Sequence, residues 1–93
     1  MIINFADRET EIIWEGQRSR RLPSDIQVIA LRKLMYLNRA KTITDLRVSP
    51  GNRLEQLKGS RRGQWSIRLN DQWRICFNWH DGEVSYVEIV DYH

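Results

Sequence analysis

The sequence predicts an α+β domain with the element order β-α-α-β-β-β-β, in which two helices pack on one face of a curled, mostly antiparallel sheet. Apolar residues recur at helical spacing between positions 26 and 37, whereas apolar and polar residues alternate along 64–69 and 73–79. Glycine, proline and asparagine separate these segments. A length of 93 residues predicts one domain, residues 1–93.

The first half of the chain is predicted to hold one short strand and two helices. Residues 2–5 are the strand, and residues 7–16 form a helix that the side chain of its first residue, an aspartate, can cap. A basic connection, 17–21, leads to the second helix within 22–40. Residues 41–52 are predicted to be an irregular loop that ends in a Ser-Pro-Gly-Asn turn.

The second half is predicted to be a β-meander. Its strands are 53–57, 64–69, 73–79 and 84–90, and a basic turn bracketed by glycines, 59–63, joins the first two.

Strand parity predicts the register, because a register that mixes the two faces of the sheet is excluded. A three-residue loop at 70–72 places Arg68 opposite Arg74. A three-residue loop at 80–82 then places Arg74 opposite Glu88.

Charge is unevenly distributed along a chain whose net charge is +3. Residues 47–78 contain seven Lys or Arg against two Asp or Glu, and residues 79–93 contain none against four. The basic middle block favours a polyanion or an acidic protein as partner. A solvated, arginine-rich surface is the alternative.

Two facing arginines repel each other, so Arg68 and Arg74 need compensation. Either Glu88 and Asp71 neutralise them, or they form a phosphate-binding floor on the open sheet face. The basic turn and its flanks extend such a floor, although they also fit an ordinary solvated turn; these residues are Arg53, Lys58, Arg61 and Arg62.

The terminal Asp91-Tyr92-His93 could serve proton transfer, because each side chain can give or take a proton. RNA cleavage by the neighbouring 2′-hydroxyl needs a base to take the hydroxyl proton, an acid to protonate the 5′-oxygen and cations to stabilise the phosphorane. The tail could supply the proton transfer and the arginines the charge stabilisation, without a metal. A frayed terminus is the alternative.

Other kinds of site are not indicated. Two histidines and one cysteine give no metal-ligand spacing, no glycine-rich nucleotide loop is present, and no cofactor is expected. Cys76 is predicted to be a small packing residue, and the tryptophans are assigned to the core. One cysteine, no apolar run that could span a membrane and no signal-like start predict a cytoplasmic protein.

Essentially the whole chain resembles a known family, weakly over residues 1–45 and strongly over residues 50–93. Residues 50–59, 63–70, 72–77 and 87–93, which include the Trp-Arg-Ile strand and the terminal Asp-Tyr-His, resemble the HigB-type toxins of the RelE superfamily, in particular the branch that includes the GraT toxin. The resemblance implies a RelE-like, microbial-RNase-type fold. It also implies cleavage of mRNA, usually in the ribosomal A site, that leaves 2′,3′-cyclic phosphate and 5′-hydroxyl ends.

The same resemblance assigns roles to residues and partners. Asp91, Tyr92, His93, Arg74 and Lys58 match catalytic positions, whereas Glu55 stands where some relatives carry a histidine and could act as the base. The implied partners are the ribosome, mRNA and a HigA-type helix-turn-helix antitoxin, with promoter DNA bound only through the toxin–antitoxin complex. The alternatives are a ParE-like inhibitor of gyrase and a non-catalytic RNA- or ribosome-binding module.

Overall fold

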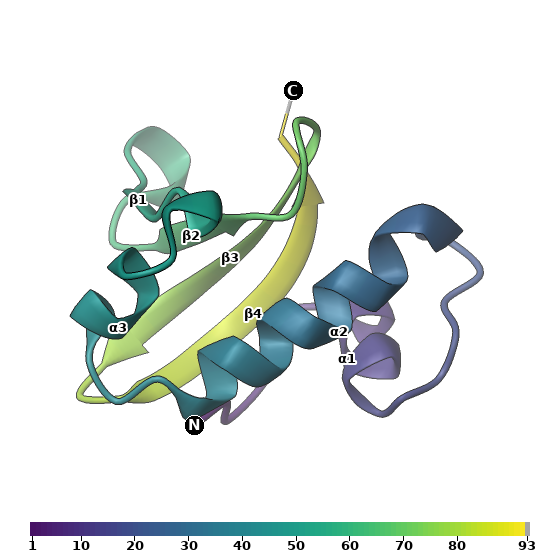
Figure 1. The fold of residues 1–93 in the computed structure, drawn as a ribbon, viewed down its shortest axis with the longest axis horizontal. Helices are drawn as coiled ribbons and strands as arrows, with labels where there is room; N and C mark the ends of the chain where they lie inside the picture. Colours follow the sequence, from purple (N-terminus) through teal and green to yellow (C-terminus); the bar gives the residue numbers. More distant parts are fainter. Residues whose placement is uncertain (93) are drawn as a thin grey trace.

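The chain folds into a four-stranded antiparallel sheet and three α-helices in a computed structural model that describes residues 1–92. The strands follow one another in the sheet in chain order and are β1 (Glu55–Gln56), β2 (Trp65–Arg68), β3 (Trp73–His80) and β4 (Glu83–Asp91). Helices α1 (Arg8–Trp14) and α2 (Ser24–Arg39) lie together on one side of the β3–β4 hairpin, and α3 (Ile43–Arg47) lies with β1 and β2 on the other side (Figure 1). The predicted α+β class is confirmed.

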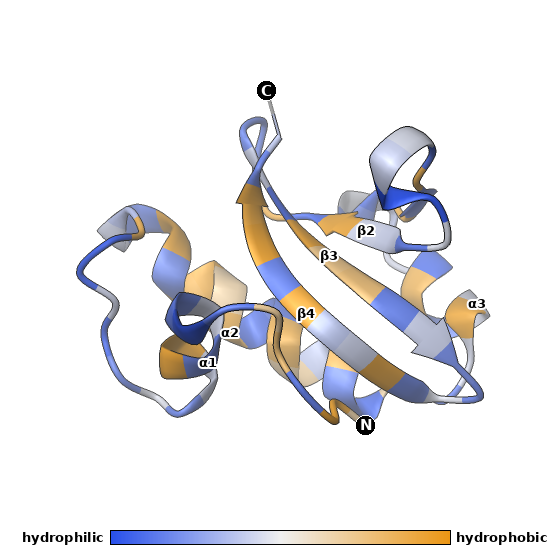
Figure 2. Ribbon diagram, turned by 180° about the vertical axis from the view of Figure 1, so that it is seen from behind, coloured by the Kyte–Doolittle hydropathy of each residue, from blue (hydrophilic) through white to orange (hydrophobic). Residues whose placement is uncertain are grey.

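The core is formed between α2 and one face of the sheet. Helix α2 supplies four residues at helical spacing, each at most 1% exposed: Ile26, Ala30, Leu34 and Leu37. The strands contribute Ile67, Ile75, Phe77 and Ile89, and Figure 2 shows hydrophobic and hydrophilic bands alternating along β4. All four tryptophans pack against this core, as predicted. No helix within residues 1–92 has the length and apolar character needed to cross a membrane.

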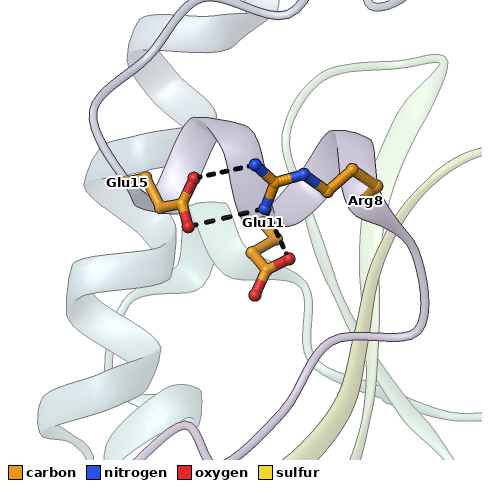
Figure 3. A network of polar contacts seen from close by, with 3 residues as sticks. All are labelled: Arg8, Glu11 and Glu15. Atoms are coloured by element: carbon orange, nitrogen blue, oxygen red, sulfur yellow. Dashed lines mark hydrogen bonds and ion pairs between the residues drawn. The ribbon is translucent and has the colours of Figure 1, made fainter.

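Helix α1 begins at the predicted place, with Asp7 at the N-cap position, but the Asp7 side chain makes no capping hydrogen bond. Instead, charges on the exposed face of the helix interact. The Arg8 guanidinium lies between two carboxylates, with Nη1 2.7 Å from Oε1 of Glu11 and Nη2 3.4 Å from Oε1 of Glu15 (Figure 3). Arg8 is therefore neutralised on its own helix.

Residues 41–52 are more regular than the predicted loop. Thr42 and Asp45 form a reciprocal capping box that starts α3, and a 3-10 turn, η1 (Pro50–Asn52), follows. Asn52 is buried, donates to the carbonyl oxygen of Leu46 at 3.2 Å and accepts a hydrogen bond from Lys33. The prediction of an irregular loop was wrong, because the capping box of Thr42 and Asp45 starts a helix at Ile43.

The N-terminal segment runs parallel to β4 but forms only two isolated bridges, Ile2 with Val84 and Phe5 with Val87. The predicted strand at 2–5 was therefore wrong as a regular strand. Between the two bridges, Tyr86 has a positive φ of 53°, and its backbone N–H donates to the Asn4 side chain at 2.6 Å. This irregularity in β4 prevents a continuous ladder.

The register of the β2–β3 hairpin is confirmed, including Arg68 opposite Arg74. The predicted register of the β3–β4 hairpin was wrong. Asp81-Gly82 is a two-residue turn in which both residues have positive φ, and a bulge then shifts the pairing, so that Glu88 lies opposite Cys76 and Val90 lies opposite Arg74. The predicted Arg74–Glu88 pair is therefore absent from residues 1–92.

The basic segment before β2 is less extended than predicted. The strand predicted at 53–57 is reduced to the two residues of β1, and the basic turn forms a 3-10 turn, η2 (Gly59–Arg61). Arg53, just before β1, has a left-handed conformation with φ 44° and ψ 56°. These short elements place the basic side chains along one edge of the sheet.

Candidate active site

The face of the sheet away from the core carries polar side chains, and we call it the polar face. Strand alternation and the observed register place its members together: Ser66, Arg68, Arg74, Cys76 and Glu88. Several of them are well buried, since Ser66 and Cys76 are fully buried and Arg74 is 8% exposed. A buried guanidinium needs partners, so its contacts define the centre of the site.

Three hydrogen bonds hold the Arg74 guanidinium. Its Nε donates to Oγ of Ser66 at 2.7 Å, and its Nη2 donates to the carbonyl oxygens of Arg53 at 2.6 Å and Ser66 at 3.3 Å. All three acceptors are neutral groups. The side chain is therefore anchored while its positive charge remains uncompensated by these bonds.

Two of the predicted catalytic residues flank this charge. Oε2 of Glu55 lies 3.9 Å from Nη2 of Arg74, and the Arg74 guanidinium carbon lies 5.4 Å from the centre of the Tyr92 ring. The side chain of Glu55 is about half exposed, and Tyr92 is also exposed. The site thus combines a buried cation with an accessible carboxylate and an accessible phenol, which are groups suited to proton transfer and charge stabilisation.

Glu88 has a different partner from the one predicted. Its Oε1 lies 3.2 Å from Nη1 of Arg61, which also donates to Oε1 of Gln64 at 3.1 Å. Cys76 lies near this pair, and its burial raises the pKa of the thiol, although the charge of Arg61 opposes that shift. A protonated, buried thiol agrees with the predicted packing role of Cys76.

The two facing arginines have different partners. Arg68 forms an ion pair with Asp71, one of the two acids that the neutralising alternative named, whereas the other acid, Glu88, pairs with Arg61. Arg74 is held by Ser66 and the carbonyl oxygen of Arg53. Asp71 is fully exposed, so its pair with Arg68 is open to competition from another anion.

Lys58 and Arg62 lie apart from the contacts of Arg74. They line one cavity of about 380 Å³ beside η2, together with Gln56, Leu57 and the two glycines 59 and 63. The cavity places two cations on the same edge of the sheet as Arg61. The roles of Lys58 and Arg62 at the site stay predictions.

The end of the chain is fixed to the β2–β3 loop as far as the structure describes it. Oδ2 of Asp91 accepts a hydrogen bond from Nε2 of Gln72 at 3.0 Å, and the backbone N–H of Tyr92 donates to the Gln72 carbonyl oxygen at 2.6 Å. The frayed-terminus alternative therefore does not hold for Asp91 and Tyr92. His93, also predicted to be catalytic, lies outside the described residues.

Sequence reasoning missed Ser66 as a site residue. The alternation of 64–69 had already placed it on the same face as Arg68, so a signal was present. The sequence did not indicate the left-handed conformation of Arg53, whose backbone carbonyl oxygen accepts a hydrogen bond from Arg74.

Three comparisons relate the chain to known proteins. A family model described as the RelE-like toxin of the type II toxin–antitoxin system HigB matches residues 3–93. Toxin HigB-1 of Vibrio cholerae is 43% identical over 94 residues, which cover 100% of this chain and 98% of that toxin. The Endoribonuclease HigB of Proteus vulgaris is 42% identical over 41 residues, which cover 44% of this chain and 45% of that enzyme. The resemblance drawn from residues 50–93 is confirmed.

Solved structures support the fold. The YoeB–YefM complex from Staphylococcus aureus matches with a TM-score of 0.62 and 17% identity, over 100% of this chain and 95% of the matched chain. A heterotetrameric YoeB–YefM toxin–antitoxin complex from the same organism gives the same values. At this identity the likeness concerns the fold alone.

Proposed function

Because the chain belongs to the HigB-like family of RelE-like toxins of type II toxin–antitoxin systems, we propose that it is an endoribonuclease that cleaves mRNA on the ribosome. The observation that carries the proposal is the buried Arg74 flanked by Glu55 and Tyr92. The name of the partly matching Proteus vulgaris relative, an endoribonuclease, supports the same activity.

The proposed chemistry is attack of a 2′-hydroxyl oxygen on the adjacent phosphorus. A base removes the 2′-hydroxyl proton, the new P–O bond closes a 2′,3′-cyclic phosphate, and the P–O bond to the 5′-oxygen breaks as an acid protonates that oxygen. Glu55, Asp91 and His93 are the proposed bases, Tyr92 is the proposed acid, and no metal takes part. Arg74 stabilises the charge that develops on the phosphorane, with Lys58 in support.

RNA binding is assigned to four arginines around this centre: Arg53, Arg61, Arg62 and Arg68. Two of them are already paired, Arg61 with Glu88 and Arg68 with Asp71, so RNA phosphates must displace carboxylates there. Neutralisation of RNA phosphates by these arginines releases counterions from the RNA, so binding is expected to weaken as the salt concentration rises.

The proposed cellular context follows from the family. A HigA-type helix-turn-helix antitoxin inhibits the protein, and the complex of the two binds promoter DNA. The solved YoeB–YefM complexes show a toxin of this fold assembled with an antitoxin. A substrate on the ribosome places the activity in the cytoplasm.

The test is to map the 5′ ends of mRNA on programmed ribosomes with wild-type protein and with His93→Ala. New 5′-hydroxyl ends in the A-site codon that are lost in the variant are expected. Cleavage that persists in His93→Ala moves proton transfer to Glu55, Asp91 or Tyr92. Absence of cleavage by the wild type contradicts the proposal and directs the next assays to gyrase inhibition and to RNA binding without cleavage.

A further inference from the structure

One edge of the Arg74 guanidinium makes hydrogen bonds within the protein. The nitrogens Nε and Nη2 donate to Oγ of Ser66, to the Ser66 carbonyl oxygen and to the Arg53 carbonyl oxygen. Within residues 1–92 these three bonds leave Nη1 as the nitrogen that can donate to an incoming phosphate. The orientation of that nitrogen therefore depends on the acceptors at the opposite edge.

The position of Ser66 explains why a small hydroxyl occurs there. Ser66 lies directly opposite Cys76 in the β2–β3 ladder, one diagonal step from Arg74, and it is fully buried. An apolar residue at 66 would leave the buried Nε–H of Arg74 without an acceptor, which is costly. A carboxylate there would place a second negative charge beside Arg74, in addition to that of Glu55.

We propose that Ser66 is a positioning residue that orients the Arg74 guanidinium toward the scissile phosphate. This inference rests on the proposed ribonuclease function and adds to it a residue that does not itself touch RNA. The Arg53 carbonyl oxygen completes the support, and η1, anchored through the buried Asn52, holds that oxygen in place. Preorganised donors are effective because they do not have to reorient during the reaction.

Single-turnover cleavage on programmed ribosomes separates positioning from binding. Ser66→Ala is expected to lower the cleavage rate constant roughly tenfold to a hundredfold, with RNA affinity changed less than about threefold, because a misplaced donor costs rate more than binding. Ser66→Thr keeps the hydroxyl and should recover most of the rate. Cys76→Ala removes a buried group of similar size from the facing position, has no bond to Arg74, and serves as the matched control.

A double-mutant cycle tests whether Ser66 acts through Arg74. In an Arg74→Ala background, Ser66→Ala should lower the rate by less than about twofold, because the interaction is already lost. An equal loss in both backgrounds overturns the proposal. So does a rate in Ser66→Ala that matches the wild type, or a Cys76→Ala variant that falls as far.

A second readout does not depend on activity. The Arg74 Nε–H resonance should exchange slowly with solvent in the wild type and in Ser66→Thr, and faster in Ser66→Ala, by nuclear magnetic resonance. Slow exchange in Ser66→Ala overturns the inference even if cleavage occurs. If the wild type does not cleave but the exchange pattern holds, the proposed function has failed, and with it the catalytic role of Ser66, whereas the hydrogen bond is verified.

Discussion

Adjacent residues of β2 and β3 face two different surroundings, although both are well buried. Ile67, Ile75 and Phe77 belong to the hydrophobic core and are fully buried among apolar side chains. Ser66 and Arg74 point the other way and are nearly as inaccessible, yet hydrogen bonds join the Arg74 guanidinium to Ser66 and to the carbonyl oxygen of Arg53. Burial alone therefore does not separate core from site; the separating feature is a buried charge held by neutral acceptors.

The largest expected effect is a loss of stability caused by a substitution on the core face of the sheet. Phe77→Ala should lower the free energy of unfolding by about 3–5 kcal/mol, because it removes a large buried side chain and leaves a cavity. Urea unfolding measures this, with the milder Phe77→Leu as a second variant. At a temperature where the variant is folded, its cleavage rate per folded molecule should remain near that of the wild type. A lost rate in folded protein would show that the two faces are not independent.

The next largest effect is a loss of cleavage, without a loss of stability, caused by a substitution in the site. Tyr92→Phe keeps the ring that lies over Arg74 and removes only the hydroxyl, so cleavage should fall by about 10²-fold or more if that hydroxyl transfers a proton. The melting temperature should not change. Tyr92→Leu, which also removes the ring, is the comparison, and wild-type cleavage by Tyr92→Phe combined with a loss in Tyr92→Leu would contradict the role as acid.

A smaller effect concerns the charge balance of the polar face. Glu88→Gln releases Arg61 from an ion pair whose side chains are 36% and 30% exposed. Such a pair is worth about 0–1 kcal/mol, so RNA affinity should rise by at most about fivefold. Glu83→Gln, at the exposed start of the same strand, changes the net charge equally and is the control. Equal gains in both variants would assign the effect to net charge, measured by binding of a short RNA at two salt concentrations.

The smallest expected effect is on stability in acid and concerns Asp45 in α3, which lies outside both faces of the sheet. Backbone hydrogen bonds from Lys41 and Thr42 lower the pKa of Asp45 below its ordinary value of 3.8. The stabilisation by this carboxylate is present above pH 3.8 and is lost as the pH falls through the lower pKa of the folded state. Asp45→Asn should therefore show a weaker loss of stability with acid in that range. An unchanged acid profile of thermal unfolding would contradict the capping role.

Alternation made the core and the first hairpin predictable, because one register alone puts Ile67 and Ile75 on the same face. The second hairpin was not predictable in the same way. Its bulge depends on a positive φ at Tyr86, which nothing in the local sequence marks, and the shift moved Glu88 away from Arg74. The charged residues of the site could be named, but their pairing could not.

The support beneath Arg74 shows the same limit. Parity placed Ser66 on the correct face, yet the carbonyl oxygen of Arg53 reaches Arg74 through a left-handed backbone conformation that glycine usually adopts. Side-chain patterns do not encode where a backbone carbonyl points. Residues 41–52 are a different case, because the Thr-x-x-Asp pattern of the Thr42-Asp45 capping box is present in the sequence and indicates the start of a helix.

The most direct test of the polar face as a ribonuclease centre is single-turnover cleavage of mRNA on programmed ribosomes by Arg74→Lys, with 5′-hydroxyl ends quantified at a temperature where the variant is folded. Lysine keeps the positive charge but cannot make the three anchored hydrogen bonds and also present a donor to phosphate. The rate is expected to fall about 10²–10³-fold while the wild type yields ends in the A-site codon. A folded Arg74→Lys protein that cleaves at the wild-type rate would contradict the assignment of the chemistry to this face.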